Sequence, residues 1–543
     1  MSRKLKIFAF SCLYVLPCFG LLPLENLSLE EKVGQILMVN FQGEVPNEDA
    51  KALIQEIKVG GIVYYNWANG LNSPEQVKKL SLGLQELSQE NSHLIPLLIA
   101  SDQEGGIVTR LSQGFTVFPG NRALGETGDS NLAAEAAFAM GQEMQAVGVN
   151  MNFAPVVDIN SNPRNPVIGI RAFGEHPEKV LAFGNKALNG YHAAGIITTL
   201  KHFPGHGDVE VDSHEALPVI NKNLDELERT ELLPFTKLAS HADVIMTAHL
   251  LVPALDSENC STLSTKTLTY LKNTIGFHGV IISDSLVMEG VLKKCETIDE
   301  AAIQAFNAGC DILLLGGKLL MKDHTSLELS VGDIRRIHSH LVKAVRSGRI
   351  SEARLNESIQ KILELKAKYL GAKISKLSTF DQTAHLKLAQ KIASRSLKVI
   401  KNTDTGPLHN KKILVLAPQL LQENLQRTTL FKKHTQMPTY FFKSLAPTSQ
   451  ELDEVKILLQ EADGFLIYSY NAWKNPLQSA LIHSVLETKK PGFLIVTRDP
   501  LDAQLFPNAH TVFLTFSPTL PSLQAVCDKL ESFLLNGYVD PLL

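Results

Sequence analysis

The sequence predicts an α/β protein in which an N-terminal (β/α)8, TIM-like barrel precedes a smaller α/β sandwich domain. Three observations support this prediction. The chain has 543 residues, more than one ordinary domain needs. Its first part alternates short apolar runs with amphipathic segments, which is typical of a parallel sheet covered by helices on both faces. Polar residues directly follow several of these runs, where a barrel carries its active site.

Eight apolar runs are the candidate strands of the barrel. A helix precedes the first run, and Ser28 is its expected N-cap, with Glu31 three residues later. Helix-like stretches such as 131–148 and 298–309 separate later runs. A doubly wound open sheet is the alternative arrangement for this pattern. The runs are residues 35–41, 60–65, 96–102, 149–158, 196–202, 242–249, 279–284 and 310–317.

The predicted domain organisation follows from where these patterns stop. The barrel is expected to span residues 26–370, followed by a linker at 371–384 and a C-terminal α/β domain at 385–543. Helix-like segments lie between the candidate strands of this second domain. Those strands are residues 411–418, 463–470, 491–498 and 510–518.

The first 20 residues have the composition of a secretory signal peptide, because a basic start precedes an apolar stretch from Ile7 to Phe19. The leader predicts export to the periplasm or the extracellular space, with no stable membrane insertion after its removal. Membrane anchoring through the leader, or through lipidation of Cys12 or Cys18, is one alternative. A buried N-terminal helix in a cytoplasmic protein is the other.

Composition excludes several classes of function. The formal net charge is −4, so no basic excess indicates a nucleic-acid partner. Four of the six cysteines lie outside the leader, widely spaced and without a CxxC pair. They therefore indicate buried free thiols and neither a disulfide scaffold nor a zinc site. The four are Cys260, Cys295, Cys310 and Cys527.

Residues 201–218, KHFPGHGDVEVDSHEALP, combine three histidines and four acids with a Pro-Gly turn, which predicts a catalytic loop. Histidine has an unperturbed pKa of about 6.5, suited to proton transfer. Asp212 and His214 can meet as a carboxylate–imidazole pair that orients the ring and favours its proton. Because a Pro-Gly pair separates His202 from His206, no helix aligns the two rings as metal ligands. No metal is expected.

Asp284 ends the seventh apolar run and has three possible roles, as a nucleophile, a metal ligand or a helix cap. Hydrolysis of a sugar bond needs one group at the anomeric centre and another that protonates the departing oxygen. Asp284 and the Asp212–His214 pair can divide these tasks.

Five further polar residues at predicted strand ends and in loops are candidates for binding a sugar. A carboxylate can accept hydroxyl protons, and glycines beside it allow close approach to a ligand. The alternative for this set is a salt-bridge network that holds the rim loops together. We expect Asp158 to give buried support, and His249 to satisfy a core hydrogen bond or line the pocket. The five candidates are Asp102, Arg110, Arg171, Lys201 and His202.

With these motifs assembled, residues 27–370 resemble the two-domain β-N-acetylglucosaminidases (β-N-acetylhexosaminidases) of glycoside hydrolase family 3. Two departures from the family pattern affect no proposed catalytic group: Ile107 replaces a common Arg, and IRAFG replaces RSFG. The markers are DQEGG (102–106), NFAPVVDINSNPRNPVIGIRAFG (152–174), KHFPGHGDVEVDSH (201–214), VIMTAHL (244–250) and SDSLVMEG (283–290).

The resemblance implies a retaining enzyme without a cofactor or metal. Asp284 would be the nucleophile that forms a covalent glycosyl-enzyme, His214 the general acid/base, and Asp212 its partner. The five binding candidates would grip the terminal sugar. The implied substrate is an oligosaccharide or muropeptide, from which terminal N-acetylglucosamine is removed in peptidoglycan turnover.

Three other functions are consistent with the same residues. A neutral imidazole does not repel phosphate, so a β-N-acetylglucosaminide phosphorylase is one alternative. A non-catalytic sugar-binding protein on an inactive barrel is the second, and a metallohydrolase is the third. The oligomeric state does not follow from the sequence.

Overall fold

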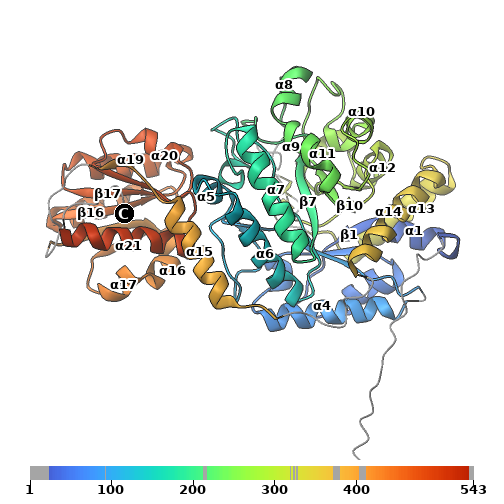
Figure 1. Ribbon diagram of the computed structural model, residues 1–543, viewed down its shortest axis with the longest axis horizontal. Coiled ribbons are helices and arrows are strands. Elements are labelled where there is room, and N and C mark those ends of the chain that lie inside the picture. Colours follow the sequence, from blue (N-terminus) through green and yellow to red (C-terminus); the bar gives the residue numbers. More distant parts are fainter. Residues whose placement is uncertain are drawn as a thin grey trace, which may run out of the picture.

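The computed structural model describes residues 24–91, 93–211, 217–317, 320–321, 324–325, 328–370, 379–402 and 411–536. The predicted leader at 1–20 lies outside the described residues, as do Asp212 and His214. Figure 1 shows a barrel and a second, separate sheet, with α5 (Asn121–Glu126) and α15 (Gln382–Ser396) between them.

Eight parallel strands form the barrel, and each comes from one of the eight predicted runs. They follow the order β10-β1-β2-β3-β6-β7-β8-β9, and a parallel bridge between Ile282 and Ile312 joins the two ends. The prediction of a barrel is therefore confirmed, and the alternative of a doubly wound open sheet is wrong. The strands are β1 (Leu37–Val39), β2 (Gly61–Tyr64), β3 (Leu98–Ser101), β6 (Met151–Asn152), β7 (Ile197–Phe203), β8 (Val244–Thr247), β9 (Val280–Ile282) and β10 (Leu313–Leu314).

Helices cover the outside of the barrel. Every barrel strand is therefore buried along its length. The predicted cap of the first helix is confirmed: Ser28 Oγ accepts from the Glu31 amide at 3.2 Å, and Glu31 accepts from the Ser28 amide at 2.9 Å. The helices that precede or follow the barrel strands include α1 (Leu29–Gln35), α4 (Pro74–Gln89), α6 (Asn131–Ala146), α7 (Pro177–Ala193), α12 (Ile298–Ala308), α13 (Val331–Arg346) and α14 (Glu352–Leu370).

Shorter elements lie in the connections of the barrel. The helices among them are α2 (Glu48–Lys51), α3 (Asn66–Asn69), α8 (Leu224–Arg229), α9 (Leu233–Leu238), α10 (Thr265–Thr269) and α11 (Glu289–Cys295). The strands among them form two antiparallel pairs, β4 (Gln103–Gly105) with β5 (Val108–Thr109) and β11 (Leu320–Met321) with β12 (His324–Thr325).

The second domain is a six-stranded sheet with the order β13-β18-β17-β16-β14-β15, parallel except at β13. The four predicted strands are present. The sequence did not predict β13 and β15, because both are sheet edges whose residues are mostly exposed or half-buried. The strands are β13 (Lys398–Asn402), β14 (Ile413–Pro418), β15 (Thr439–Phe442), β16 (Gly464–Ser469), β17 (Gly492–Val496) and β18 (Thr511–Leu514).

Helices cover both faces of this second sheet, since alternate strand residues enter two separate apolar clusters. One face packs against α18 (Ser449–Glu461), α19 (Pro476–Glu487) and α20 (Leu501–Leu505). The other face packs against α16 (Gln422–Arg427), α17 (Thr429–Lys433) and α21 (Leu520–Asn536). This is the α/β sandwich that the sequence predicts.

Helix α15 contacts both units. Its residues Ala389 and Ile392 belong to the apolar core of the barrel, and His385 Nδ1 lies 2.8 Å from Glu143 Oε1 of α6. The same helix packs along α21 of the second domain. The predicted boundary at residue 385 therefore falls inside α15, and residues 371–378 of the predicted linker lie outside the described residues.

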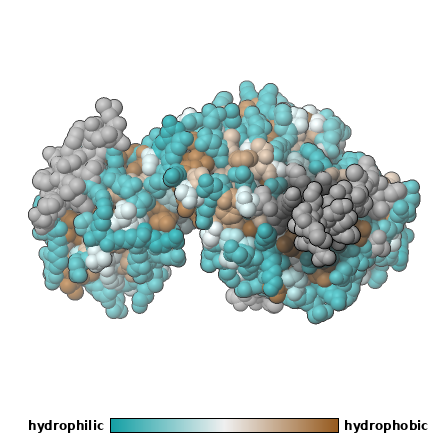
Figure 2. Space-filling model, turned by 60° about the horizontal axis from the view of Figure 1, so that its bottom comes forward, coloured by the Kyte–Doolittle hydropathy of each residue, from teal (hydrophilic) through white to brown (hydrophobic). Residues whose placement is uncertain are grey.

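The surface is mostly hydrophilic, with scattered apolar residues on the face that Figure 2 shows. Within the described ranges, no helix is both long and apolar enough to cross a membrane. The four cysteines outside the leader are free and buried, as the sequence predicts.

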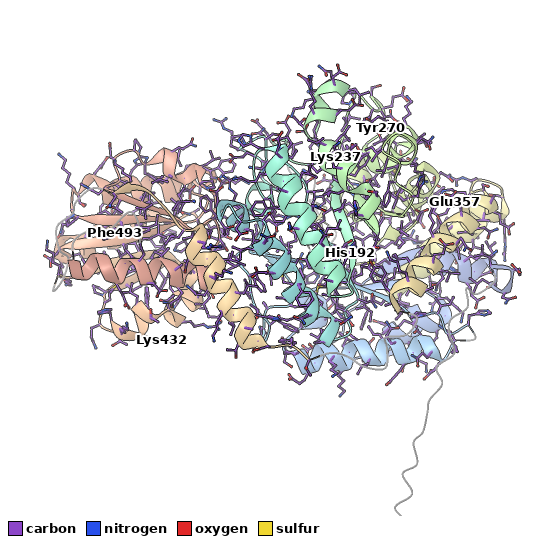
Figure 3. All side chains as sticks on the ribbon, in the orientation of Figure 1. His192, Lys237, Tyr270, Glu357, Lys432 and Phe493 are labelled. Carbon is purple, nitrogen blue, oxygen red and sulfur yellow. The ribbon has the colours of Figure 1, made fainter. Side chains whose placement is uncertain are left out.

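A polar cluster joins the barrel at the N-terminal end of its strands. Asp243, 7% exposed, precedes β8 and accepts from Lys368 Nζ at 2.8 Å and the Tyr369 hydroxyl at 2.7 Å. His192 Nε2 on α7, labelled in Figure 3, lies 2.8 Å from the same carboxylate. Burial raises the pKa of Asp243, but these hydrogen bonds outweigh burial and lower it to about 2.

This cluster is expected to make the barrel sensitive to acid. The folded-state pKa of Asp243 lies below the unfolded value of about 3.9, so its stabilisation is complete above pH 4 and is lost towards pH 2. Between pH 5 and pH 2, the unfolding free energy of the native chain should fall about 2 kcal/mol more than that of Asp243→Asn. Urea titrations at several pH values measure this. Asp453→Asn, at an exposed carboxylate of α18, is the control. Parallel pH profiles for Asp243→Asn and the native chain would contradict the prediction.

Candidate active site

A cavity of about 340 Å³ opens at the C-terminal ends of the barrel strands. Its volume lies at the small end of the range for ligand pockets. The cavity brings together six predicted site residues from five different strand ends and loops. They are Asp102, Arg110, Arg171, Lys201, His202 and Asp284.

His202, the last residue but one of β7, is held by the fully buried Asp158. Its Nδ1 lies 2.6 Å from Asp158 Oδ2, and its backbone amide donates to Oδ1 at 3.0 Å. Burial raises the pKa of Asp158, but the interactions with His202 outweigh it and lower the pKa. Because an ionised carboxylate can only accept a hydrogen bond, Asp158 keeps a proton on Nδ1 of His202. The other ring nitrogen, Nε2, lies 3.4 Å from Arg171 Nη2. Asp158 thus gives the buried support that the sequence predicts.

Glu104 connects two predicted binding residues that lie far apart in the sequence. Its carboxylate accepts from Arg171 Nε at 2.9 Å and Nη2 at 2.8 Å, and from Lys201 Nζ at 2.7 Å. The side chain is 2% exposed. Burial raises the pKa of Glu104, but the charges of Arg171 and Lys201 outweigh burial and lower it to about 2. The carboxylate is therefore ionised near pH 7.

Glu104 was not among the residues predicted from the sequence. Only the aspartate and the glycines of DQEGG were interpreted, although the second acid, two residues after Asp102, was a usable signal. The partners of Glu104 lie 67 and 97 positions further along the chain, so only the closed barrel shows that it joins them.

Asp102 completes the charged network. Its Oδ1 accepts from Lys201 Nζ at 2.8 Å, and its Oδ2 lies 3.5 Å from Arg110 Nη2. Burial raises the pKa of Asp102, but Lys201 and Arg110 outweigh it and lower the pKa. The Lys201 ammonium thus bridges two ionised carboxylates, Asp102 and Glu104, and the network offers a ligand both acceptors and donors.

The β4–β5 hairpin that carries Glu104 is fixed by backbone geometry and by Gln103. Gln103 exchanges two hydrogen bonds of 2.9 Å with the Asn152 side chain through its backbone amide and carbonyl. Gly106 has φ +63°, and a Cβ there would lie 2.9 Å from the Pro119 carbonyl oxygen. Only glycine accommodates this turn without strain.

Two aromatic residues in the cavity wall were also missed from the sequence. Tyr65 and Trp67 stack with ring centroids 4.4 Å apart, and the Arg110 guanidinium lies 5.7 Å and 5.4 Å from their centroids. They follow β2 at the same rim as the predicted residues, so the strand-end argument applied to them as well. Burial, with the charges of Asp102 and Asp284, raises the pKa of Tyr65, which keeps its hydroxyl protonated.

Asp284 follows β9 and is positioned by its neighbours. Its Oδ1 accepts from the Ser285 amide at 2.7 Å, and its own amide donates to Thr247 Oγ1 at 3.3 Å. The nearest helix, α11, has Met288 as its N-cap, so the helix-cap role is excluded. His249 Nε2 lies 2.9 Å from the Ser285 carbonyl oxygen, in the fully buried core, which is the core hydrogen bond anticipated for it.

His206 also lines the cavity, beside His202. Burial and the nearby His202 lower its pKa to about 4, so its imidazole is neutral near pH 7. Among the described residues, no group of three or more His, Cys, Asp or Glu side chains is placed to hold a metal ion.

Comparison with known proteins places this site in a family. Residues 28–365 match the glycosyl hydrolase family 3 N-terminal domain, which covers more than half of the chain. The chain belongs to glycosyl hydrolase family 3. Membership confirms the resemblance inferred from the sequence motifs.

Several known proteins are similar to this chain in sequence, and one solved structure matches the fold along nearly its whole length. The chain is 33% identical over 430 residues to beta-hexosaminidase A of Pseudoalteromonas piscicida, covering 72% of this chain and 70% of that protein. It is 35% identical over 304 residues to beta-hexosaminidase of Pseudomonas aeruginosa, covering 55% and 86%. The solved family 3 beta-N-acetylglucosaminidase of Paenibacillus sp. FPU-7 superposes with a TM-score of 0.84 at 34% identity, covering 95% of this chain and 98% of that one.

Proposed function

We propose that this protein is a retaining exo-β-N-acetylglucosaminidase that acts through a covalent glycosyl-aspartate. One observation carries the proposal: Asp284 lines the same small cavity as Asp102, Lys201 and Arg171, and the last two share the buried carboxylate of Glu104. A nucleophile beside a set of hydroxyl-binding groups is what hydrolysis of a terminal sugar requires. Relatives named beta-hexosaminidase support the choice of N-acetylglucosamine as the sugar.

The network would hold the non-reacting hydroxyls of the terminal sugar. Asp102 can accept two hydroxyl protons, while Arg110, Arg171 and Lys201 donate. Because each cation already has an anionic partner, the groups keep their positions when no sugar is bound. Such preorganisation lowers the cost of orienting the substrate.

In the first step, an Asp284 carboxylate oxygen attacks the anomeric carbon while His214 gives its proton to the glycosidic oxygen. The bond between that oxygen and the sugar breaks, and the leaving group departs as an alcohol. In the second step, neutral His214 takes a proton from water, whose oxygen attacks the same carbon and releases Asp284. Two inversions at one carbon retain its configuration.

The roles of His214 and Asp212 rest on the sequence motif, since both lie outside the described residues. In this proposal, the Asp212 carboxylate stabilises the imidazolium of His214 and raises its pKa. His214 is then protonated for the first step and neutral for the second.

For the natural substrate, we propose peptidoglycan fragments that end in N-acetylglucosamine. The leader at residues 1–20 supports this choice, because an exported enzyme meets cell-wall glycans directly. The small volume of the cavity supports removal of one terminal residue at a time.

A panel of aryl β-glycosides tests the proposal with the purified protein. The aryl N-acetylglucosaminide should be cleaved at least about a hundredfold faster, by kcat/KM, than the aryl glucoside, because unpaired polar groups in a specific site penalise the wrong sugar. Equal cleavage of both would overturn the substrate assignment. Sugar 1-phosphate formed on adding inorganic phosphate would identify a phosphorylase. Binding without turnover would identify a sugar-binding protein.

A further inference from the structure

The loop that carries Arg171 forms part of the cavity wall. Arg171 ends the 3-10 helix η3 (Gly169–Arg171), and its Nη1 donates to the Val167 carbonyl at 3.3 Å. Val167 and Arg171 both line the cavity. A displacement of residues 166–171 would therefore move a group that the proposed function assigns to sugar binding.

The second domain contacts this loop at two residues. Lys474, at the end of the 3-10 helix η8 (Ala472–Lys474) after β16, donates from Nζ to the Pro166 carbonyl at 3.2 Å. Asp499, which is 8% exposed and follows β17, approaches Gly169 so closely that a Cβ there would lie 3.8 Å from its Oδ2. Both contacts come from the C-terminal ends of parallel strands in the second sheet.

Helix α5 forms a second connection between the domains. Asn121 Nδ2 donates to the Arg171 carbonyl at 2.8 Å. The next residue, Arg122, places its guanidinium 5.6 Å from the ring centroid of Phe516, a buried residue that follows β18. Ala123, one position further, is fully buried within the apolar cluster of the second domain. Three consecutive residues thus join the Arg171 backbone to the core of the other domain, as the position of α5 in Figure 1 illustrates.

We propose that the second domain positions Arg171, so that Lys474 and Phe516 act on sugar binding through the 166–171 loop without touching the substrate. This inference rests on the proposed function of the cavity. The inference assigns the second domain a specific role, because its contacts converge on the part of the cavity wall that carries Arg171. A domain that was only tethered to the barrel would have no need of contacts at that position.

A pair of double variants tests the inference in the full chain. Lys474→Met/Phe516→Leu keeps the apolar volume but removes the hydrogen bond and the ring. Its matched control, Lys401→Met/Phe493→Leu, removes a lysine that donates to the Pro507 carbonyl at 2.7 Å and a buried ring inside the second domain. Figure 3 labels Phe493, which lies on the second sheet away from the barrel.

The readout is binding of N-acetylglucosamine, measured without turnover. The chain has two tryptophans, so Trp473→Phe in every protein leaves Trp67 of the cavity wall as the fluorescent reporter. Loss of one cation–π contact and one hydrogen bond should raise Kd about three- to tenfold, with KM rising in parallel and kcat changing less. The control pair should leave Kd unchanged. Thermal unfolding of each protein checks that both pairs remain folded.

An Arg171→Ala background separates positioning from general damage. If the second domain acts through Arg171, Lys474→Met/Phe516→Leu should raise Kd no further in that background, since coupled residues are not additive. The inference would be overturned if Lys474→Met/Phe516→Leu left Kd unchanged in the native background. It would also be overturned if the pair raised Kd by the same factor in the Arg171→Ala background as in the native one. Either result would leave the proposed function standing. If the native protein neither binds nor cleaves N-acetylglucosaminides, the proposed function fails, and the inference fails with it.

Discussion

Replacing Asp284 with asparagine is expected to lower kcat/KM for an aryl N-acetylglucosaminide at least about 10⁴-fold. The amide keeps the size of the carboxylate and its contact with the Ser285 amide, but it cannot form the covalent bond to the anomeric carbon. Asp284 lines the cavity, and its backbone amide donates a hydrogen bond to Thr247 Oγ1, which holds the residue in place. We therefore expect no other carboxylate to take over its role. Steady-state kinetics measure the loss.

Two controls make this result specific. Asp256 is a buried carboxylate near the same end of the barrel, where it accepts from Ser264 Oγ at 2.8 Å and does not line the cavity. Asp256→Asn should lower stability and keep kcat/KM within about tenfold of the native value. A 5-fluoro N-acetylglucosaminyl fluoride should label Asp284, as read by peptide mass spectrometry. Label on another residue, or substantial turnover by Asp284→Asn, would refute the nucleophile assignment.

Glu104→Gln is the second large effect that we expect, on both binding and stability. The substitution keeps the shape of the side chain but leaves Arg171 and Lys201 without the anion that they share. Removing one partner of a buried ion pair costs about 3–5 kcal/mol, because the remaining charge is uncompensated. We expect the unfolding free energy to fall by about this amount. We also expect KM to rise about ten- to a hundredfold, because both cations lose their fixed positions.

Glu143→Gln is the matched control for this prediction. Glu143 is also 2% exposed, and it accepts from the Thr116 amide at 2.8 Å and lies 2.8 Å from His385 Nδ1, outside the cavity. Its substitution should also lower stability, measured by urea unfolding, but should leave KM unchanged. If Glu104→Gln changed stability alone, as Glu143→Gln should, Glu104 would have no role in positioning the sugar-binding cations.

The barrel was predictable because its information is local. Each strand is a short apolar run that must be buried on both faces, and such runs show in the sequence whatever their partners are. The edge strands β13 and β15 lack this signal, since all their residues except the buried Phe442 are exposed or half-buried. The same limit applies to α15, whose contacts with two domains depend on where each domain lies.

The candidate site divides in the same way. Asp102, Arg110, Arg171, Lys201, His202 and Asp284 stood out because polar residues at strand ends or in rim loops of a barrel lie at its active-site face. Tyr65 and Trp67 lie at the same rim, after β2, but a rule that looks for polar residues does not find aromatic ones. Asp212 and His214 remain predictions from their motif.

The sequence by itself determined the fold class, the family and the rim at which a sugar would bind, because apolar periodicity and short motifs are properties of neighbouring residues. Only the tertiary structure decided that Glu104 joins Arg171 to Lys201, and that Lys474 and Phe516 of the second domain contact the Arg171 loop and the helix that holds it. The physical reason is distance along the chain. Ion pairs and hydrogen bonds act over a few ångströms in space, and chain closure alone determines which distant residues come that close.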